Sequence, residues 1–131
     1  MRYCCRQYTG KSVDLDELTN VIVQFFREEN FKVHALKMGR RFFVQARKGG
    51  MYRPVLSNDH AFTMAIEGEP SDFKILLGVS PWHDMPEPSA AEPFFSNPIS
   101  AFTEVKESIW SYELEHNLWH YIENQIELGL Q

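Results

Sequence analysis

Apolar residues along the chain follow two different periods, which divide it into helical and extended segments. Between Asp14 and Asn30 they recur every three or four positions and form one stripe, made of Leu15, Leu18, Val21, Ile22, Phe25 and Phe26. Asp14 and Glu17 have the spacing of a capping box, in which the first side chain accepts a hydrogen bond from the first helical turn. The pattern predicts an amphipathic helix that begins after Asp14, ends near Asn30 and lies on a sheet.

Two segments with a period of two flank Gly39-Arg40 and predict a β-hairpin within residues 31 to 52. Side chains alternate between the two faces of a strand. In the second strand one face carries Phe42, Val44 and Ala46, and the other carries Phe43, Gln45 and Arg47. We expect the Phe42 face to join the core. Gly49-Gly50 then forms a tight turn rather than a phosphate-binding loop, because neither a GxGxxG nor a GKS/T pattern is present.

Three further segments alternate in the same way and predict strands at residues 2 to 8, 61 to 68 and 73 to 80, the last two joined by a loop at 69 to 72. A chain of 131 residues, 44% of them apolar, has the size and the core of one domain. We therefore expect a single α+β domain over residues 1–131. Its antiparallel sheet of four or five strands has the element order β-α-β-β-β-β-α, with one N-terminal helix and a C-terminal helix or helices.

Residues 81 to 98 contain five of the seven prolines, which predicts an extended connection that packs on the domain through Trp82, Phe94 and Phe95. A helical segment follows from Pro98 to about Leu128. Its first half has an apolar face made of Phe102, Val105 and Ile109, and its second half has a nearly opposite face made of Leu114, Leu118, Tyr121, Ile122 and Ile126. Either the helix breaks near Trp110-Ser111, or one half meets a second surface. A homodimer through the C-terminal helices would provide that surface.

Cysteine content and hydropathy indicate the setting of the chain. The only two cysteines are adjacent, at Cys4 and Cys5, which excludes a disulfide scaffold and favours small strand residues over a redox or metal pair. No apolar run approaches the roughly 20 residues of a membrane-spanning helix. The first ten residues lack the apolar centre of a secretory signal. We expect a cytoplasmic protein without a membrane span.

Charge is unevenly distributed along the chain. The net charge is −5, yet residues 32 to 53 hold seven of the 13 basic residues and no acidic one, which leaves about −12 on the remainder. Basic residues interleaved with Phe42, Phe43 and Tyr52 are suited to binding phosphates and stacking bases. Two observations oppose this interpretation. Phe42 and Phe43 are candidates for the core, and lysine and arginine commonly protect a sheet edge. The candidate anion-binding residues are Lys37, Arg40, Arg41, Arg47, Lys48 and Arg53, and the partner is a nucleic acid or an acidic protein.

Histidines and carboxylates form three other groupings. Glu113, His116 and His120 share one helical face and have the spacing of a three-ligand metal site, although the polar face of an amphipathic helix would hold the same residue types. The catalytic Glu beside the first His of a zincin helix is missing. Asp59-His60 and His83-Asp84 are adjacent pairs that we assign to turns, because sequence neighbours point apart and no nucleophile motif accompanies them. No cofactor is expected.

The chain resembles a family of small uncharacterised prokaryotic α+β domains in four segments, VQARKGG at 44–50, AFTMAIEG at 61–68, FKILLGVSPWHD at 73–84 and LWHYIENQI at 118–126. Other members carry a pair of membrane helices before the last helix, or a zinc ribbon at one end. Here residues 83 to 110 hold a Pro-rich connection and a helix in place of the membrane pair. The resemblance implies the α+β fold, and it implies no activity and no catalytic residue.

These features together predict a nonenzymatic binding or assembly module, dimeric through its C-terminal helices, with a basic hairpin at residues 37 to 53 that holds an anionic partner. The alternative is a metal-dependent enzyme that uses Glu113, His116 and His120. A third interpretation is purely structural, with the dimer itself as the product.

Overall fold

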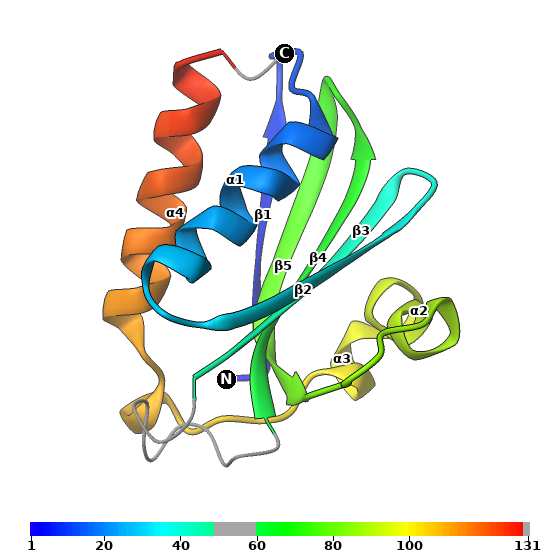
Figure 1. Cartoon of the computed structure of the whole chain (residues 1–131), viewed down its shortest axis with the longest axis vertical. Coiled ribbons are helices and arrows are strands. Elements are labelled where there is room, and N and C mark those ends of the chain that lie inside the picture. The colour runs from blue at the N-terminus through cyan, green and yellow to red at the C-terminus, as the bar shows by residue number, and fades with distance from the viewer. Residues whose placement is uncertain (49–59, 130–131) are drawn as a thin grey trace.

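The computed structural model describes residues 1–48 and 60–129 of the chain. Within these ranges, five antiparallel strands form one sheet in the order β1-β5-β4-β3-β2 (Figure 1). The strands are β1 Tyr3–Thr9, β2 Lys32–Met38, β3 Arg41–Arg47, β4 His60–Glu69 and β5 Asp72–Pro81. This arrangement confirms the predicted α+β fold, with a first helix after β1 and helices after β5.

Helix α1, Leu15–Glu28, has the boundaries that its sequence pattern predicts. The Asp14 carboxylate accepts a hydrogen bond from the main-chain N–H of Glu17 at 3.2 Å, which satisfies one of the amides left unpaired at a helix start. The apolar stripe is buried, with Leu18 and Ile22 fully covered. Asn30 follows with a φ of 67°, a left-handed conformation that ends the helix and turns the chain into β2.

The β2–β3 hairpin also forms as predicted, with a two-residue turn at Gly39-Arg40 in which Gly39 has a φ of 65°. Phe42 is buried on the face of the sheet that packs against α1, as we expected. Phe43, on the other face, is fully buried as well. Both faces of β3 are therefore core faces, and the Phe42 face is not the only one.

The second face of the sheet is covered by the segment that the sequence predicts to be extended. α3, Pro98–Ala101, lies where the predicted helical segment begins, but residues 88 to 96 of the predicted extended connection form α2, Pro88–Ser96. The extended conformation predicted for residues 88 to 96 is wrong, because Pro88 occupies the first turn of α2, where a proline has no intrahelical hydrogen bond to lose. Phe94 and Phe95 do anchor the segment, as expected, since both are buried against the sheet.

The chain then crosses from the second face of the sheet to the first (Figure 1). Phe102 is buried in the α2 and α3 layer, whereas Val105 and Trp110 belong to the core beneath α1. A 3₁₀ turn, η1, spans Glu107–Ile109, and helix α4, Tyr112–Glu127, follows its capping residue Ser111. The helical segment therefore breaks near Trp110-Ser111, and a continuous helix from Pro98 to Leu128 is wrong.

The described residues of both apolar faces are thus buried by the chain itself, with Phe102 on one side of the sheet and Val105 on the other, in the same core as the apolar face of α4. In α4 the buried residues are Leu114, Leu118, Trp119, Ile122 and Ile126. Because the chain covers these faces itself, they do not require a partner, and the homodimer stays a prediction. Among the described residues, no helix is both long and apolar enough to cross a membrane.

Candidate functional site

The basic hairpin lies at one side of the sheet, where β2 is the outermost described strand (Figure 1). The structure describes five of the six candidate anion-binding residues, Lys37, Arg40, Arg41, Arg47 and Lys48. Arg53, like Tyr52, Gly49-Gly50 and Asp59, lies outside the described residues. The five form two groups at opposite ends of the hairpin, about 20 Å apart for strands of seven residues.

At the turn of the hairpin, Lys37 and Arg40 form ion pairs with carboxylates from other elements. Lys37 Nζ lies 2.8 Å from an oxygen of Asp16 in α1, and an Arg40 nitrogen lies 2.6 Å from Glu69 at the end of β4. More than half of each of these four side chains is exposed. Exposed pairs of this kind contribute about 0–1 kcal/mol each, so both cations can exchange partners at little cost.

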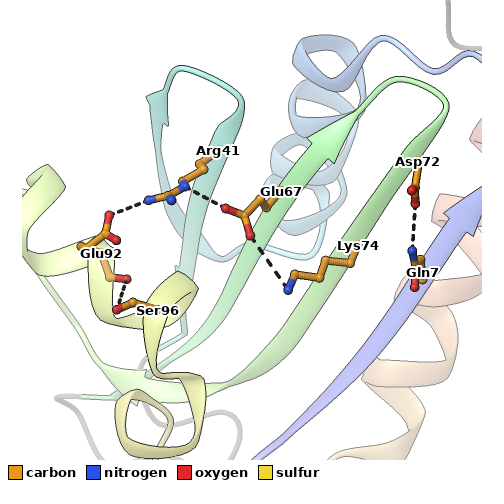
Figure 2. A network of polar contacts seen from close by, with 7 residues as sticks. All are labelled: Gln7, Arg41, Glu67, Asp72, Lys74, Glu92 and Ser96. Atoms are coloured by element: carbon orange, nitrogen blue, oxygen red, sulfur yellow. Dashed lines mark hydrogen bonds and ion pairs between the residues drawn. The ribbon is translucent and has the colours of Figure 1, made fainter.

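Arg41 has a different environment, because it joins three elements on the second face of the sheet (Figure 2). Its Nε donates to Glu67 of β4 at 2.8 Å, and a terminal nitrogen donates to Glu92 of α2 at 2.6 Å. Its guanidinium also lies 5.3 Å from the centre of the Phe95 ring. Glu67 in turn approaches Lys74 of β5 at 3.9 Å. Arg41 therefore fixes α2 against the sheet, and we place it among the structural residues.

At the opposite end, cations gather around an indole ring. The Arg47 guanidinium and the Lys32 ammonium lie 4.7 Å and 5.7 Å from the centre of the Trp82 ring, and His34 stacks on that ring at 4.1 Å. Lys48 donates to the main-chain carbonyl of Glu29 at 2.7 Å. Trp82 follows β5, so this corner combines residues from β2, β3 and the end of β5. The sequence did not identify Trp82 or Lys32 as parts of a site.

A buried polar network positions the Trp82 corner, and Gln45 is its centre. The Gln45 side chain is fully buried and donates from Nε2 to the carbonyl of Pro81 at 2.9 Å. Its Oε1 accepts from the main-chain N–H of His83 at 2.9 Å. These two main-chain partners fix the orientation of the amide, since a carbonyl only accepts and an N–H only donates. His34 Nε2, 3.0 Å from the same Oε1, therefore carries a proton.

The hydroxyl groups of Thr63 and Ser80 complete the buried network around Gln45. Gln45 Nε2 also lies 3.1 Å from the Thr63 hydroxyl oxygen and 3.0 Å from that of Ser80, so its two N–H donors are shared among three acceptors, and the two hydroxyl oxygens lie 2.6 Å apart. Burial lowers the pKa of His34 below its ordinary value, although the hydrogen bond to Gln45 partly opposes this effect. A polar Gln in an otherwise apolar strand was the sequence signal for this network.

The structure removes one part of the nucleic-acid hypothesis. Phe42 and Phe43, which we considered as stacking platforms for bases, are 4% and 0% exposed. Stacking requires an open ring face. The two rings are core residues, and the idea that they stack bases is wrong.

A groove of about 700 Å³ opens beside the hairpin turn, between the start of α1 and the β4–β5 turn. Its wall includes Arg40, but also the carboxylates of Asp14, Asp16 and Glu69. Because carboxylates outnumber the basic side chain there, the groove does not favour an anion. The exposed edge strand and turn of the hairpin, rather than the interior of this groove, are the better anion-binding surface.

The proposed metal ligands lie on the exposed face of α4. The rings of His116 and His120 are nearly parallel, with centres 6.2 Å apart, and Glu113 is exposed on the same helix. In residues 1–48 and 60–129, no group of three or more His, Cys, Asp or Glu side chains is arranged to hold a metal ion. The geometry therefore adds no support to the metal-dependent alternative.

The remaining candidates fall into structural roles. Asp84 accepts a hydrogen bond from the Trp82 indole N–H at 2.7 Å, and the main-chain N–H of His83 binds Gln45, as expected of turn residues. Cys4 and Cys5 are free thiols. Burial, together with the nearby Glu115 carboxylate, raises the pKa of the Cys4 thiol to about 12.

The outer part of the β2–β3 hairpin, which consists of strand β2 and the turn, is thus the surface that carries exposed basic side chains. Lys32 and Lys37 are exposed on its edge strand, and Arg40 is exposed at its turn. The three cations come from one continuous segment, so a single elongated partner would reach all of them. Comparisons of the chain with protein-family models, with curated proteins and with solved structures gave no match.

Proposed function

We propose that the protein is a nonenzymatic binding module and that its β2–β3 hairpin holds an anionic partner. The observation that carries the proposal is the exposed row of cations along the outer hairpin, where Lys32, Lys37 and Arg40 follow one another over the edge strand and the turn. A row of separate cations matches a partner with several negative charges rather than one small anion.

The existing ion pairs of Lys37 and Arg40 are compatible with this role. Their partners Asp16 and Glu69 are themselves more than half exposed, so both carboxylates regain water when a ligand replaces them. The exchange substitutes one carboxylate for another and changes the free energy by less than about 1 kcal/mol per pair. Binding energy then depends on the number of contacts made together.

Electrostatics away from the hairpin limits the choice of partner. The rest of the chain carries about −12, and this charge repels a long polyanion wherever it extends past the hairpin. A short acidic ligand confined to the hairpin avoids the repulsion. We therefore expect short acidic ligands to bind better, relative to their length, than long ones.

The proposal is tested by titration with two short anions at low and moderate salt. One is a capped peptide of alternating Glu and Thr with the seven-residue length of β2, and the other is a short single-stranded DNA. Binding of either anion should weaken as salt rises, because the contacts are electrostatic. Lys37→Glu should weaken it about tenfold, equivalent to about 1.4 kcal/mol.

Lys106→Glu is the matched control, because Lys106 is an exposed lysine in the connection between α3 and α4 and the charge change is the same. It should shift the dissociation constant less than about twofold. If neither anion binds, or if the two variants weaken binding equally, the hairpin is not the binding surface.

A further inference from the structure

We propose that the outer edge of β2 binds an acidic, extended protein segment, which adds to the sheet as a further strand. This inference rests on the proposed function and specifies its partner. Strand addition uses main-chain hydrogen bonds for affinity and alternate side chains for selectivity. It therefore requires a strand with unpaired main-chain groups and side chains that complement the incoming segment.

The turn geometry identifies the main-chain groups that point outward. In a two-residue hairpin the pair that closes the turn, here Met38 with Arg41, is hydrogen-bonded, and the two types of pair then alternate. The even-numbered residues of β2 therefore bind β3. The N–H and C=O groups of Val33, Ala35 and Lys37 point away from the sheet.

These outward groups are available for a partner within the described structure. No described main-chain group or side chain forms a hydrogen bond to the N–H or C=O of these three residues. Each pair of N–H and C=O can form two hydrogen bonds with an added strand, and a row of three such residues is a regular template. The middle residue, Ala35, is exposed and has a side chain too small to obstruct an incoming strand.

The side chains of β2 favour an acidic occupant. Lys32 projects on the α2 side of the sheet and Lys37 on the α1 side, because their positions have opposite parity along the strand. An added strand also alternates its side chains, so carboxylates on either of its faces meet a lysine. Opposite charges on neighbouring strands stabilise the pairing by about 0.2–1 kcal/mol per pair.

The other side of the sheet is unsuited to the same ligand. β1 is the outermost described strand there, and α4 places carboxylates next to it. Glu123 pairs with Arg6 of β1 at 2.6 Å, and Glu127 pairs with Lys11 just after β1 at 2.9 Å. Both of these basic side chains are thus paired with carboxylates of the same chain. On β2, Lys37 is paired in the same way, but Lys32 lies beside the Trp82 ring and has no ion pair among the described residues, so β2 is the better edge for an acidic segment.

A second copy of β2 is a poorer occupant than an acidic segment. Two paired β2 strands would gather the lysines of both copies at one interface without any carboxylate of β2 to balance them, and edge lysines are a common device against self-pairing. A nucleic acid lacks the peptide N–H and C=O groups that would pair with the outward main-chain groups of β2. Charge and edge geometry therefore favour an acidic extended segment over both.

The test removes one outward N–H while leaving every charge in place. Ala35→Pro deletes the central donor of the row without breaking a hydrogen bond to β3, and proline is tolerated at such positions of edge strands. Ala35→Thr keeps the N–H and is the matched control. The ligand is the alternating Glu and Thr peptide, and circular dichroism verifies that both variants fold.

We expect Ala35→Pro to weaken peptide binding at least tenfold and Ala35→Thr to change it less than about threefold. The same peptide methylated on its alternate main-chain nitrogens should also lose at least tenfold, which tests the hydrogen bonds without altering the protein. In NMR hydrogen exchange, the peptide should slow the amides of Val33, Ala35 and Lys37.

Two results overturn strand addition while leaving the proposed function in place. One is full binding by Ala35→Pro and by the methylated peptide together with weak binding by Lys37→Glu. The other is salt-sensitive, Lys37-dependent binding of the DNA with no binding of the peptide. A third result concerns the protein without peptide. If the β2 amides become better protected from exchange as the protein concentration rises, the edge pairs with a second copy of the chain, and the proposal of an acidic segment is wrong. If no anion binds, the proposed function fails as well.

Discussion

Replacing Gln45 with Leu should destabilise the protein through the partners that the amide leaves behind. Leu has a similar size, so the main effect is the loss of the hydrogen bonds that Gln45 forms in a fully buried position. The hydroxyls of Thr63 and Ser80 keep the hydrogen bond that they form with each other at 2.6 Å. The N–H groups of His83 and of the His34 ring lose the acceptor that they share.

The magnitude follows from these two donors. An unsatisfied buried donor costs about 1–3 kcal/mol, which gives about 2–6 kcal/mol for the pair. Both histidines are only half-buried, so water can reach part of the network. We therefore expect a loss of about 2–4 kcal/mol in the free energy of unfolding. His34→Phe removes one of the two unsatisfied donors. The variant with both Gln45→Leu and His34→Phe should therefore lose about 1 kcal/mol less stability than the sum of the losses of the two single variants.

Urea unfolding followed by tryptophan fluorescence measures these differences, and amide exchange gives a local check. The His83 N–H should exchange slowly in the wild type and rapidly in Gln45→Leu, because its acceptor is gone. A loss below about 1 kcal/mol, or an unchanged exchange rate at His83, would refute the view that Gln45 fixes the chain beneath Trp82.

Two further predictions follow from pKa shifts. Exposed Cys5 should react rapidly with a thiol reagent near neutral pH, whereas Cys4, whose pKa is raised to about 12 by burial and by Glu115, should react only after unfolding; two equal rates would contradict this. Burial lowers the pKa of His34 below its ordinary value of 6.5, so the unfolded chain binds more protons in this range and the free energy of unfolding falls as pH drops below about 6.5. His34→Phe should reduce the slope of that pH dependence, measured by urea unfolding, and an unchanged slope would assign it to other groups.

Local patterns were sufficient to predict most of the fold. Gly39-Arg40 marks the hairpin turn, and Asp14 marks the start of α1, because both features depend on residues close in sequence. Helix α2 was missed because its prolines suggest an extended chain, while its stability depends on burying Phe94 and Phe95 against a distant part of the sheet. That contact is tertiary and leaves no periodic signal.

The candidate site was harder to predict for the same reason. Residues 30 to 58 contain no Asp or Glu, so the sequence alone suggests that the basic side chains of the hairpin have no carboxylate partners. The fold brings Asp16, Glu67, Glu69 and Glu92 to it from three other elements. Only the three-dimensional arrangement separates Arg41, which is tied into the structure, from Lys37 and Arg40, whose exposed pairs can exchange.

The most direct test of the central claim is the titration of the acidic peptide against wild type, Lys37→Glu and Lys106→Glu at low and moderate salt. The account predicts binding that weakens as salt rises, an about tenfold loss for Lys37→Glu and little change for Lys106→Glu. Equal affinity for all three proteins, or an affinity that salt does not alter, would contradict the assignment of the β2–β3 hairpin as an anion-binding surface.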